Sequence, residues 1–314
     1  MTFLAPLLAS ALVALPWRVA TYNVAALSAR DSEARFMSIA ATIKASGFPE
    51  VVALQEVADN DGVVNSGNTR ADASLAKLQQ AITQAAGPTY KTIQFEPVDN
   101  SEGGPPGANI RNVLLLHANL HVADVERLFA SDAAFNDTRK PLHARVTVQD
   151  TAVDIVVVHL SAAPHAEQKR IEQTQRLAAW VRAQRRGEII VMGDFNAAHD
   201  DLVWPTLRSA GLRDAAAHVV ATHESGQAFD RIFIGDALDA VAPGQVMPQT
   251  AASDHALVWV PLQQREASVN GGCQYAPRPS GFGWWPLVLL VCKRWRRSVL
   301  RRCGKTRTCG SIGT

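Results

Sequence analysis

The stretch "GEIIVMGDFNAAHDD", from Gly187 to Asp201, joins a short apolar run to polar residues at its end. Four apolar residues, Ile189 to Met192, are followed at once by Gly-Asp-Phe-Asn. A short apolar run bounded by glycine is typical of a buried strand. Alternate side chains of an extended chain share a face, so Asp194 and Asn196 are expected to point one way and Phe195 back into the core. The stretch therefore predicts a strand that brings an acid and an amide to one place.

Similar apolar runs alternate with helical segments on both sides of this stretch. Strands fall in two groups, which favours an α/β fold: a four-layered sandwich of two packed, mainly antiparallel β-sheets flanked by helices. We predict strands at 17–25, 51–57, 90–97, 111–117, 143–149, 152–160, 188–193, 229–235 and 255–262, and helices at 31–46, 72–87, 167–186 and 202–210.

Charge is unevenly distributed along the chain. The 314 residues are 47% apolar and 19% charged, with a formal net charge of +2. Nine Lys and Arg residues and no acids follow Ala267, so the first 266 residues hold 22 basic and 29 acidic residues, a net charge of −7. Such a domain is not expected to bind nucleic acid by charge alone, but it can meet phosphates through a bound cation. All four cysteines lie beyond residue 272, so the main domain has neither disulfide nor thiolate chemistry.

Residues 1–16 have the composition of a secretory signal peptide. The apolar run from Phe3 to Pro16 is too short to span a bilayer, and Ala11 to Ala14 is a candidate cleavage region. No Lys or Arg precedes the run, so a misassigned start or an extra apolar segment is the alternative. We expect an exported protein that is secreted, periplasmic or held at the cell surface.

The C-terminal region has the composition of a linker and a tail. Residues 265–282 are rich in Gly, Pro and Ser, and residues 283–314 contain "WWPLVLLVC" followed by "KRWRRSVLRR". This order of cysteine, apolar segment and Arg cluster resembles the MYXO-CTERM sorting tails of some bacteria. The apolar part is shorter than the ~20 residues of a spanning helix. We expect a sorting signal or an anchor that associates with a membrane; an uninformative extension of the reading frame is the alternative.

Polar residues capable of chemistry stand at the tips of six apolar runs. Side chains at the ends of adjacent strands converge, so we expect them to form one site. Asn23 follows "VATY", Glu56 follows "VVALQ", His159 follows "DIVVV", Asp194 and Asn196 follow "IIVMG", Asp230 precedes "RIFI", and Asp254 and His255 precede "ALVWV".

In their order, these runs resemble the signature of the endonuclease/exonuclease/phosphatase superfamily. The matching segments are "VATYNVA", "VVALQEV", "VVVVHLSAAP", "VMGDFN", "FDRIFI" and "SDHALV", from Asn23 to His255. Within the superfamily, "QFEP", "TRKP" and "HLSAAPHAE" are similar to deoxyribonuclease I, and "GGPPGANIRNVLLL" resembles a Gly-rich segment of secreted bacterial nucleases. Two features differ from deoxyribonuclease I. The small disulfides of the pancreatic form of that enzyme are absent, and Gln94 stands where the family has an aromatic residue, two positions before Glu96. The resemblance implies that residues 17–264 are a catalytic domain.

Oxygen ligands for a metal ion are expected at the ends of the first two apolar runs. Asn23 and Glu56 offer a neutral and an anionic oxygen, which suit Mg²⁺. The main domain has no Cys and few clustered His, which argues against zinc. The resemblance implies the same metal site, with Asp254 a ligand of the metal or its neighbour. We expect Mg²⁺ as cofactor, with Mn²⁺ or Ca²⁺ able to substitute or assist; a solvated strand-end acid is the alternative for Glu56.

Hydrolysis of a phosphodiester needs an activated water and a cation at the phosphate. Asp194 is the best candidate for the base that activates the water, and Asn196 can donate to a phosphoryl oxygen. The resemblance implies that Asp230 pairs with His255, and such a carboxylate favours the charged form of the ring. The imidazolium would then sit on the phosphate.

Further candidates come from the similarity to deoxyribonuclease I. It implies a second acid–histidine pair of Glu96 with His159, and either His159 or His255 can protonate the leaving group. Arg139 and Arg111 are candidates for a phosphate clamp, because guanidinium holds phosphate in bidentate fashion; a surface cation is the alternative for Arg111. The remaining histidines are expected to be structural or solvent-facing: His117, His121, His143, His165, His199, His218 and His223.

Three functions are compatible with this pattern. The first is a metal-dependent, exported endonuclease that acts on DNA, which is the function we expect. RNA as a further substrate is left open, and the protein is expected to be a monomer. The second candidate is a phosphodiesterase or phosphatase for lipid or inositol head groups, but the apolar hairpin of lipid-acting members is missing between Asn23 and His255. The third is a binding module without activity, which predicts the loss of a catalytic residue. The expected catalytic residues are all present, which favours an enzyme: Glu56, Asp194, Asn196 and His255.

Overall fold

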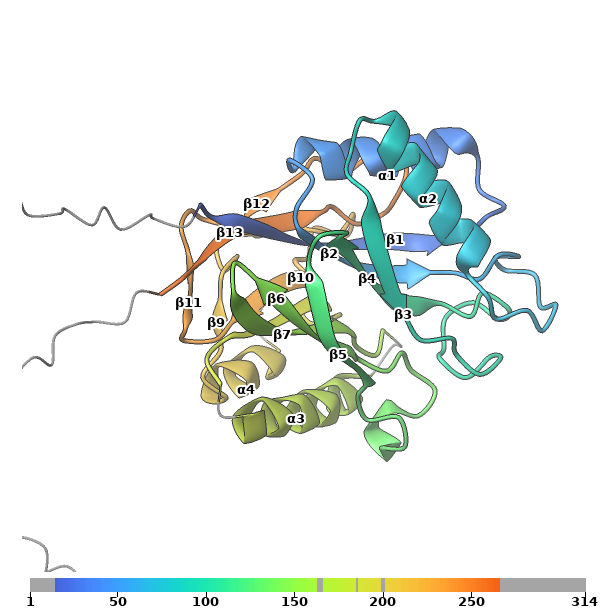
Figure 1. The fold of residues 1–314 in the computed structure, drawn as a ribbon. Coiled ribbons are helices and arrows are strands. Elements are labelled where there is room, and N and C mark those ends of the chain that lie inside the picture. Colours follow the sequence, from blue (N-terminus) through green and yellow to red (C-terminus); the bar gives the residue numbers. More distant parts are fainter. Residues whose placement is uncertain (1–14, 163–165, 185, 199–200, 266–314) are drawn as a thin grey trace, which may run out of the picture. The chain divides into compact units, whose positions relative to one another are not determined.

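The computed structural model of the protein describes residues 15–162, 166–184, 186–198 and 201–265 (Figure 1). Most of the predicted signal peptide, nearly all of the linker and the whole C-terminal tail lie outside the described residues. The described part contains thirteen strands, four α-helices and one 3₁₀ helix, η1 (Ala133–Phe135). None of the described helices is both long and apolar enough to cross a membrane.

The first sheet has seven strands. Their order is β11-β13-β1-β2-β4-β3, and β12 pairs with β13. Only β1 and β2 run parallel in this sheet, because α1 connects them. The strands are β1 (Trp17–Leu27), β2 (Val51–Val57), β3 (Tyr90–Gln94), β4 (Arg111–His117), β11 (Leu238–Ala240), β12 (Gln245–Val246) and β13 (Val258–Gln264).

The second sheet has six strands in the order β5-β6-β7-β8-β10-β9. Its one parallel pair is β7 with β8, connected through α3. The two sheets are therefore built alike, each around one β-α-β unit. The strands are β5 (His121–Arg127), β6 (Leu142–Val148), β7 (Thr151–His159), β8 (Ile189–Asp194), β9 (Arg213–Asp214) and β10 (Asp230–Ile234).

Helices cover the outer face of each sheet (Figure 1). One apolar cluster joins α1 (Glu33–Ala45) and α2 (Asp72–Gln84) to the first sheet, and another joins α3 (Glu167–Gln184) and α4 (Val203–Ser209) to the second. The largest cluster fills the space between the sheets. These layers confirm the predicted four-layered sandwich of two mainly antiparallel sheets.

The predicted helices are all present, but the strands differ in two respects. The strand predicted at 90–97 ends at Gln94, before Pro97, which cannot donate to a strand ladder. The strand predicted at 255–262 begins only at Val258. The pattern did not predict β5, β9, β11 or β12. Three of these are two or three residues long, and β5 is an edge strand with mostly exposed side chains, so it lacks a clear alternation of apolar residues.

Candidate active site

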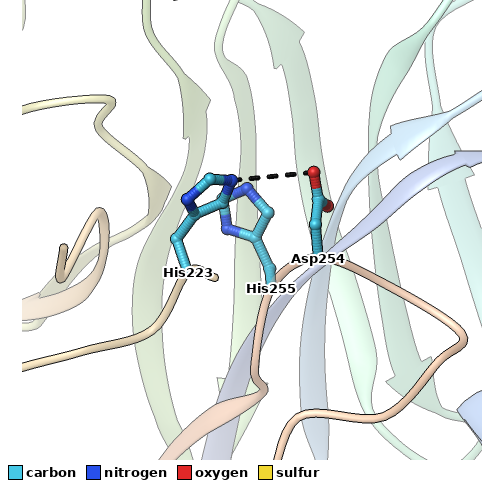
Figure 2. Close-up of side chains that lie close together, drawn as sticks. All are labelled: His223, Asp254 and His255. Atoms are coloured by element: carbon cyan, nitrogen blue, oxygen red, sulfur yellow. Dashed lines mark ion pairs between the residues drawn. The ribbon is translucent and has the colours of Figure 1, made fainter. Parts of the chain in front are cut away.

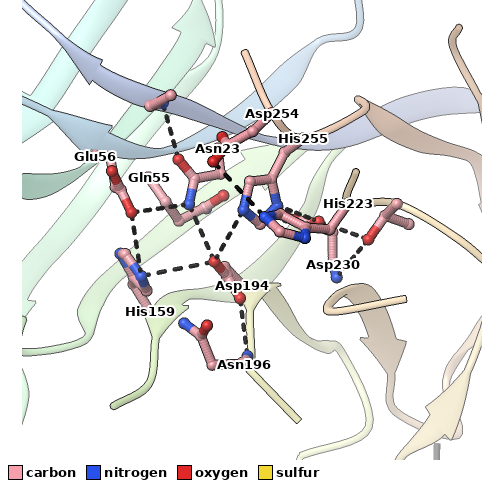
Figure 3. Close-up of polar contacts among 12 residues, drawn as sticks. Asn23, Gln55, Glu56, His159, Asp194, Asn196, His223, Asp230, Asp254 and His255 are labelled. Carbon is pink, nitrogen blue, oxygen red and sulfur yellow. Dashed lines mark hydrogen bonds and ion pairs between the residues drawn. The ribbon is translucent and has the colours of Figure 1, made fainter. Parts of the chain in front are cut away.

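Polar side chains from the two sheets meet where the parallel strand pairs end (Figure 3). Asn23 lies in β1 and Glu56 near the end of β2, while His159 and Asp194 are the last residues of β7 and β8. Asn23 Nδ2 donates to Glu56 Oε1 at 3.2 Å and to Asp194 Oδ2 at 3.0 Å. One amide thus connects a carboxylate of the first sheet to a carboxylate of the second.

Two neighbours fix the direction of Asp194. Gly193 has a φ of +146°, and a Cβ at this position would lie only 1.9 Å from the Val158 carbonyl oxygen, so only glycine fits. Phe195 is fully buried, and its ring centroid lies 5.5 Å from those of Trp204 and Phe233. The predicted inward position of Phe195 is confirmed, and the strand end turns Asp194 toward the site.

Asp194 is the centre of the cluster. It is 1% exposed, and its Oδ1 accepts the backbone N–H of Asn196 at 2.8 Å. Its Oδ2 accepts from Asn23 and lies 3.6 Å from His159 Nε2 and 3.7 Å from His255 Nε2. Asn196 Nδ2 donates to a backbone carbonyl at 3.2 Å. The carboxylate is therefore surrounded by nitrogens while remaining buried.

Asp230 and His255 form the expected pair. His255 Nδ1 lies 2.7 Å from Asp230 Oδ2, and the same oxygen accepts the hydroxyl of Thr222 at 2.7 Å. Asp230 begins β10, directly opposite Asp194 of β8 in the antiparallel register. Because Nδ1 is held by the carboxylate, His255 presents Nε2 to Asp194.

The two histidines of the site differ in charge. Burial alone would lower the pKa of His255, but the carboxylates of Asp230, Asp194 and Asp254 outweigh it and raise the pKa to about 10. Burial lowers the pKa of His159 well below its usual value, helped by nearby positive charges. Burial, together with the negative charge of Asp230, raises the pKa of Asp194. At neutral pH the site therefore combines a charged His255 with a neutral His159.

A backbone irregularity turns Glu56 toward this cluster. Glu56 has a φ of 59°, and the pairing of β2 with β4 changes register between Leu54 and Val57. Such a bulge redirects a side chain out of the strand alternation. Burial raises the pKa of Glu56, and the nearby charge of Asp194 adds to this effect.

A groove of about 320 Å³ extends from Glu56 and contains Arg139. Arg139 is 4% exposed, and its guanidinium donates to the Leu160 carbonyl oxygen at 2.9 Å. Its Nε is buried and has no partner among the described residues, so the protein does not satisfy every donor of the guanidinium. The structure brings Arg139 to the site. The groove is lined by Glu56, Gly103, Gly104, Pro105, Ile110, Asp137, Thr138, Arg139, Ser161 and Ala162.

The expected pairing of Glu96 with His159 is wrong. Glu96 is exposed just beyond the end of β3, where its carboxylate accepts the hydroxyl of Thr69. His159 Nε2 instead lies 3.7 Å from Glu56 Oε1, and its Nδ1 has no partner among the described residues. Sequence similarity therefore assigned the wrong acid to His159, whose nearest carboxylates are those of Asp194 and Glu56.

Arg111 is not arranged as a phosphate clamp. Its guanidinium donates to Gln94 Oε1 at 3.0 Å and to the carbonyl oxygens of Thr69 and Asn109 at 2.6 and 3.0 Å. Burial lowers its pKa to about 10. These contacts hold the segments around β4 together, which corrects the expectation of a phosphate contact.

Asp254 lies at the open side of the site, and its side chain is 44% exposed. Its carboxylate faces His223, with 3.6 Å between His223 Nε2 and Asp254 Oδ2. Thr222 and His223 were not predicted as site residues. They precede Asp230 by eight and seven positions in "THESGQAFD", and only the turn before β10 brings them to Asp230 and His255. A repeating pattern of apolar and polar residues does not predict the shape of this turn, so the sequence did not point to Thr222 or His223.

The carboxylates fit a divalent metal ion. Burial raises the pKa of both Glu56 and Asp194, so their paired charges call for a cation. Carboxylate oxygens of Asp194 and Asp230 also lie within 4.8 Å of a ring nitrogen of His255. Asn23 turns Nδ2 toward the carboxylates while its Oδ1 accepts the N–H of Ala25, so it fits as a ligand only with its amide rotated.

Several solved structures have the same fold as this chain. The human Nocturnin catalytic domain with bound sulfate is 18% identical, with a TM-score of 0.58 over 80% of this chain and 95% of that one. D. rerio TDP2 complexed with single-strand DNA product is 17% identical, with a TM-score of 0.56 over 79% and 99%. A mannosyl-6-phosphatase of Bacteroides thetaiotaomicron is 17% identical, with a TM-score of 0.53 over 79% and 99%. No curated protein sequence matches this chain significantly.

The family of this chain is shown by its sequence. A profile of the endonuclease/exonuclease/phosphatase family matches residues 20–255, a range that includes the whole polar cluster. Enzymes of this family hydrolyse phosphoester bonds and typically depend on a divalent metal ion. The chain belongs to the endonuclease/exonuclease/phosphatase family.

Proposed function

We propose that the protein is a Mg²⁺-dependent phosphodiester hydrolase, an exported endonuclease that acts on DNA. The observation that carries the proposal is the position of Asp194, which lies 3.7 Å from the charged ring of His255 and 3.6 Å from the neutral ring of His159. A base and a cation are thus held side by side at one point, as in-line attack on a phosphate requires.

Asp194 acts as the general base. Its raised pKa makes it a stronger proton acceptor than an exposed aspartate, which favours removal of a proton from the attacking water. Hydrogen bonds from Asn23 and Asn196 hold the carboxylate in place, so little reorganisation is needed when water attacks.

His255 stabilises the charge that develops on the phosphate and supplies the proton for the leaving oxygen. Of the two histidines it alone is protonated at neutral pH, because Asp230 and its neighbours raise its pKa to about 10. His159 remains neutral and contributes a hydrogen bond. Arg139, which lines the groove, binds a phosphate oxygen of the substrate.

Glu56 would hold the metal ion, with Asn23 and Asp254 beside it, which leaves the Asp194 carboxylate to act as the base. When bound, the ion neutralises phosphate charge and favours ionisation of water. Carboxylate and amide oxygens favour Mg²⁺, with Mn²⁺ or Ca²⁺ as substitutes. The excess of acids in the main domain supports a cation between protein and phosphate, since a net charge of −7 over the first 266 residues repels a bare polyanion.

DNA as substrate is supported by the TDP2 structure with its DNA product, which has the same fold. The mannosyl-6-phosphatase with this fold shows why substrate class must be measured directly. The full-length protein should be incubated with supercoiled plasmid, linear DNA, RNA, sphingomyelin, inositol phosphates and mannose 6-phosphate, each with and without Mg²⁺. Nicking of the plasmid with Mg²⁺ is expected. Turnover restricted to the lipid or the small phosphates would overturn the nuclease proposal but leave the hydrolase assignment intact.

Export is also part of the proposal, supported by the signal-like composition of residues 1–16 and the sorting-tail composition of residues 283–314. Cell fractionation of an expressing bacterium should find the protein outside the cytoplasm, free or held at the membrane by its tail. A cytoplasmic protein that keeps Met1 and all of residues 2–16 would refute export.

A further inference from the structure

A second cluster of metal-binding side chains lies beside the proposed catalytic carboxylates. His223, Asp254 and His255 each offer one ligand atom, and these atoms all lie within 4.8 Å of one another (Figure 2). The rings of His223 and His255 meet edge to face with their centroids 4.6 Å apart. The backbones of the two histidines form an isolated antiparallel bridge, so the cluster has a defined geometry.

The spacing suits a metal ion better than a hydrogen bond. The 3.6 Å between His223 Nε2 and Asp254 Oδ2 is too long for a hydrogen bond. Two ligands of a tetrahedral zinc ion, each about 2.0–2.1 Å from the metal, are about 3.4 Å apart. The pair therefore needs to move by only a few tenths of an ångström to share one ion.

The orientation of His255 also favours metal ligation. Its Nδ1 is held by Asp230 at 2.7 Å, which leaves Nε2 for a metal. A carboxylate on the far nitrogen is the usual support of a metal-bound histidine. The carboxylate of Asp254 is 44% exposed and the ring of His223 20% exposed, so an ion can enter from solvent.

The chemistry of the ligands selects the type of ion. Two imidazoles and one carboxylate suit Zn²⁺ and related transition-metal ions, whereas Mg²⁺ prefers oxygens. The other nitrogen of His223, Nδ1, lies 2.8 Å from Ser225 Oγ and 3.1 Å from Ser225 N. With a metal ion on Nε2, Nδ1 would carry the proton of the ring. Nδ1 would then donate to the Ser225 hydroxyl instead of accepting the Ser225 N–H.

We propose that His223, Asp254 and His255 form a site for a transition-metal ion such as Zn²⁺, and that its occupation inhibits hydrolysis. The inhibition rests on the proposed function, because the ion would occupy the His255 nitrogen that faces the phosphate. The site itself requires only the three side chains. The scarcity of clustered histidines in the sequence argued against zinc, but folding places two of them in contact.

Binding is tested with Co²⁺, whose visible absorption reports nitrogen and oxygen ligation in a tetrahedral site. The full-length protein is used with its four cysteines replaced by serine, since thiolates bind Co²⁺ themselves. A visible absorption band that saturates with one equivalent and is removed by Zn²⁺ is expected. The band should be lost in His223→Ala and His223→Gln and kept in His121→Ala, an exposed histidine of β5. A spectrum unchanged by both His223 substitutions would overturn the site.

Inhibition is measured as plasmid nicking with excess Mg²⁺ and increasing Zn²⁺. Measured against its own Mg²⁺-supported rate without Zn²⁺, each of His223→Ala and His223→Gln should need about tenfold more Zn²⁺ for half-maximal inhibition, comparable with the loss of other metal-supporting residues. His121→Ala should behave as the parent protein. Equal inhibition of parent and His223 variants would refute regulation through this site. If no substrate is turned over, the proposed nuclease function fails while the Co²⁺ spectrum still tests the site.

Discussion

His255 Nδ1 lies 2.7 Å from Asp230 Oδ2, and this buried contact is the main positive contribution to a pKa of about 10 for His255. Burial by itself would disfavour the charged ring, so the carboxylates must more than compensate for lost hydration. The site thereby keeps a cation next to Asp194 throughout the neutral range.

Replacement of Asp230 by Asn should remove that compensation. The pKa of His255 is higher in the folded protein, at about 10, than in the unfolded chain, at about 6.5. The ion pair therefore adds its full contribution to the free energy of unfolding below about pH 6.5, and this contribution is lost as the pH rises toward about 10. Asp230→Asn should weaken this loss of stability between pH 7 and 10 and lower kcat about 10²-fold at pH 7. Urea unfolding at several pH values and nicking rates check both. An unchanged pH dependence of stability would contradict the role of the pair.

Asp194→Asn should lower kcat by about 10²–10⁴-fold, because it removes the general base while keeping the size of the side chain. Thermal unfolding should show a folded protein. Asp124→Asn, an exposed acid in β5, serves as the control and should retain parental activity. Near-normal turnover of the Asp194 variant would exclude it as the base.

Acid should destabilise the protein through His159. The pKa of this buried ring is well below its usual value, so the unfolded chain takes up a proton at a higher pH than the folded protein does. Stability should therefore decrease as pH falls below about 6.5. His159→Gln should be less sensitive to acid in urea unfolding between pH 7.5 and 5. Parallel curves for the two proteins would show that His159 is not held neutral.

Chelation should abolish hydrolysis. Glu56 and Asp194 have raised pKa values, and without a cation their charges repel each other. EDTA should stop nicking, and Mg²⁺ or Mn²⁺ should restore it. Glu56→Gln should raise the Mg²⁺ concentration for half-maximal rate about tenfold. Hydrolysis that persists in EDTA would rule out the metal-dependent mechanism.

Phe195→Ala should destabilise the fold by about 3–5 kcal/mol, the usual cost of a large cavity in a core. Phe195 is fully buried against Trp204 and Phe233, and its loss should also loosen the end of β8 that carries Asp194. Urea unfolding measures the first effect and nicking at saturating Mg²⁺ the second. A change below 1 kcal/mol would mean that the ring does not anchor this turn.

Local patterns were sufficient to predict most of the strands and the polar residues at their tips. The apolar runs before Asn23, His159 and Asp194 mark buried strands in either sheet, because the alternation of side chains depends only on neighbouring residues. Edge strand β5 was missed because most of its side chains are exposed and it gains stability from pairing with β6 rather than from a buried face.

Local sequence was enough to predict the strands with their helices and the direction of Phe195, because these follow from residues close together in the chain. The need for glycine at position 193 comes from the fold, because the Val158 carbonyl oxygen that leaves no room for a Cβ lies in the neighbouring strand β7. Tertiary structure alone decided that His159 faces Glu56 instead of Glu96 and that His223 packs against His255. It also decided that Arg111 binds backbone carbonyls. These contacts join segments that are separated in the chain, and they depend on strand register and on how two sheets pack, which no local period encodes.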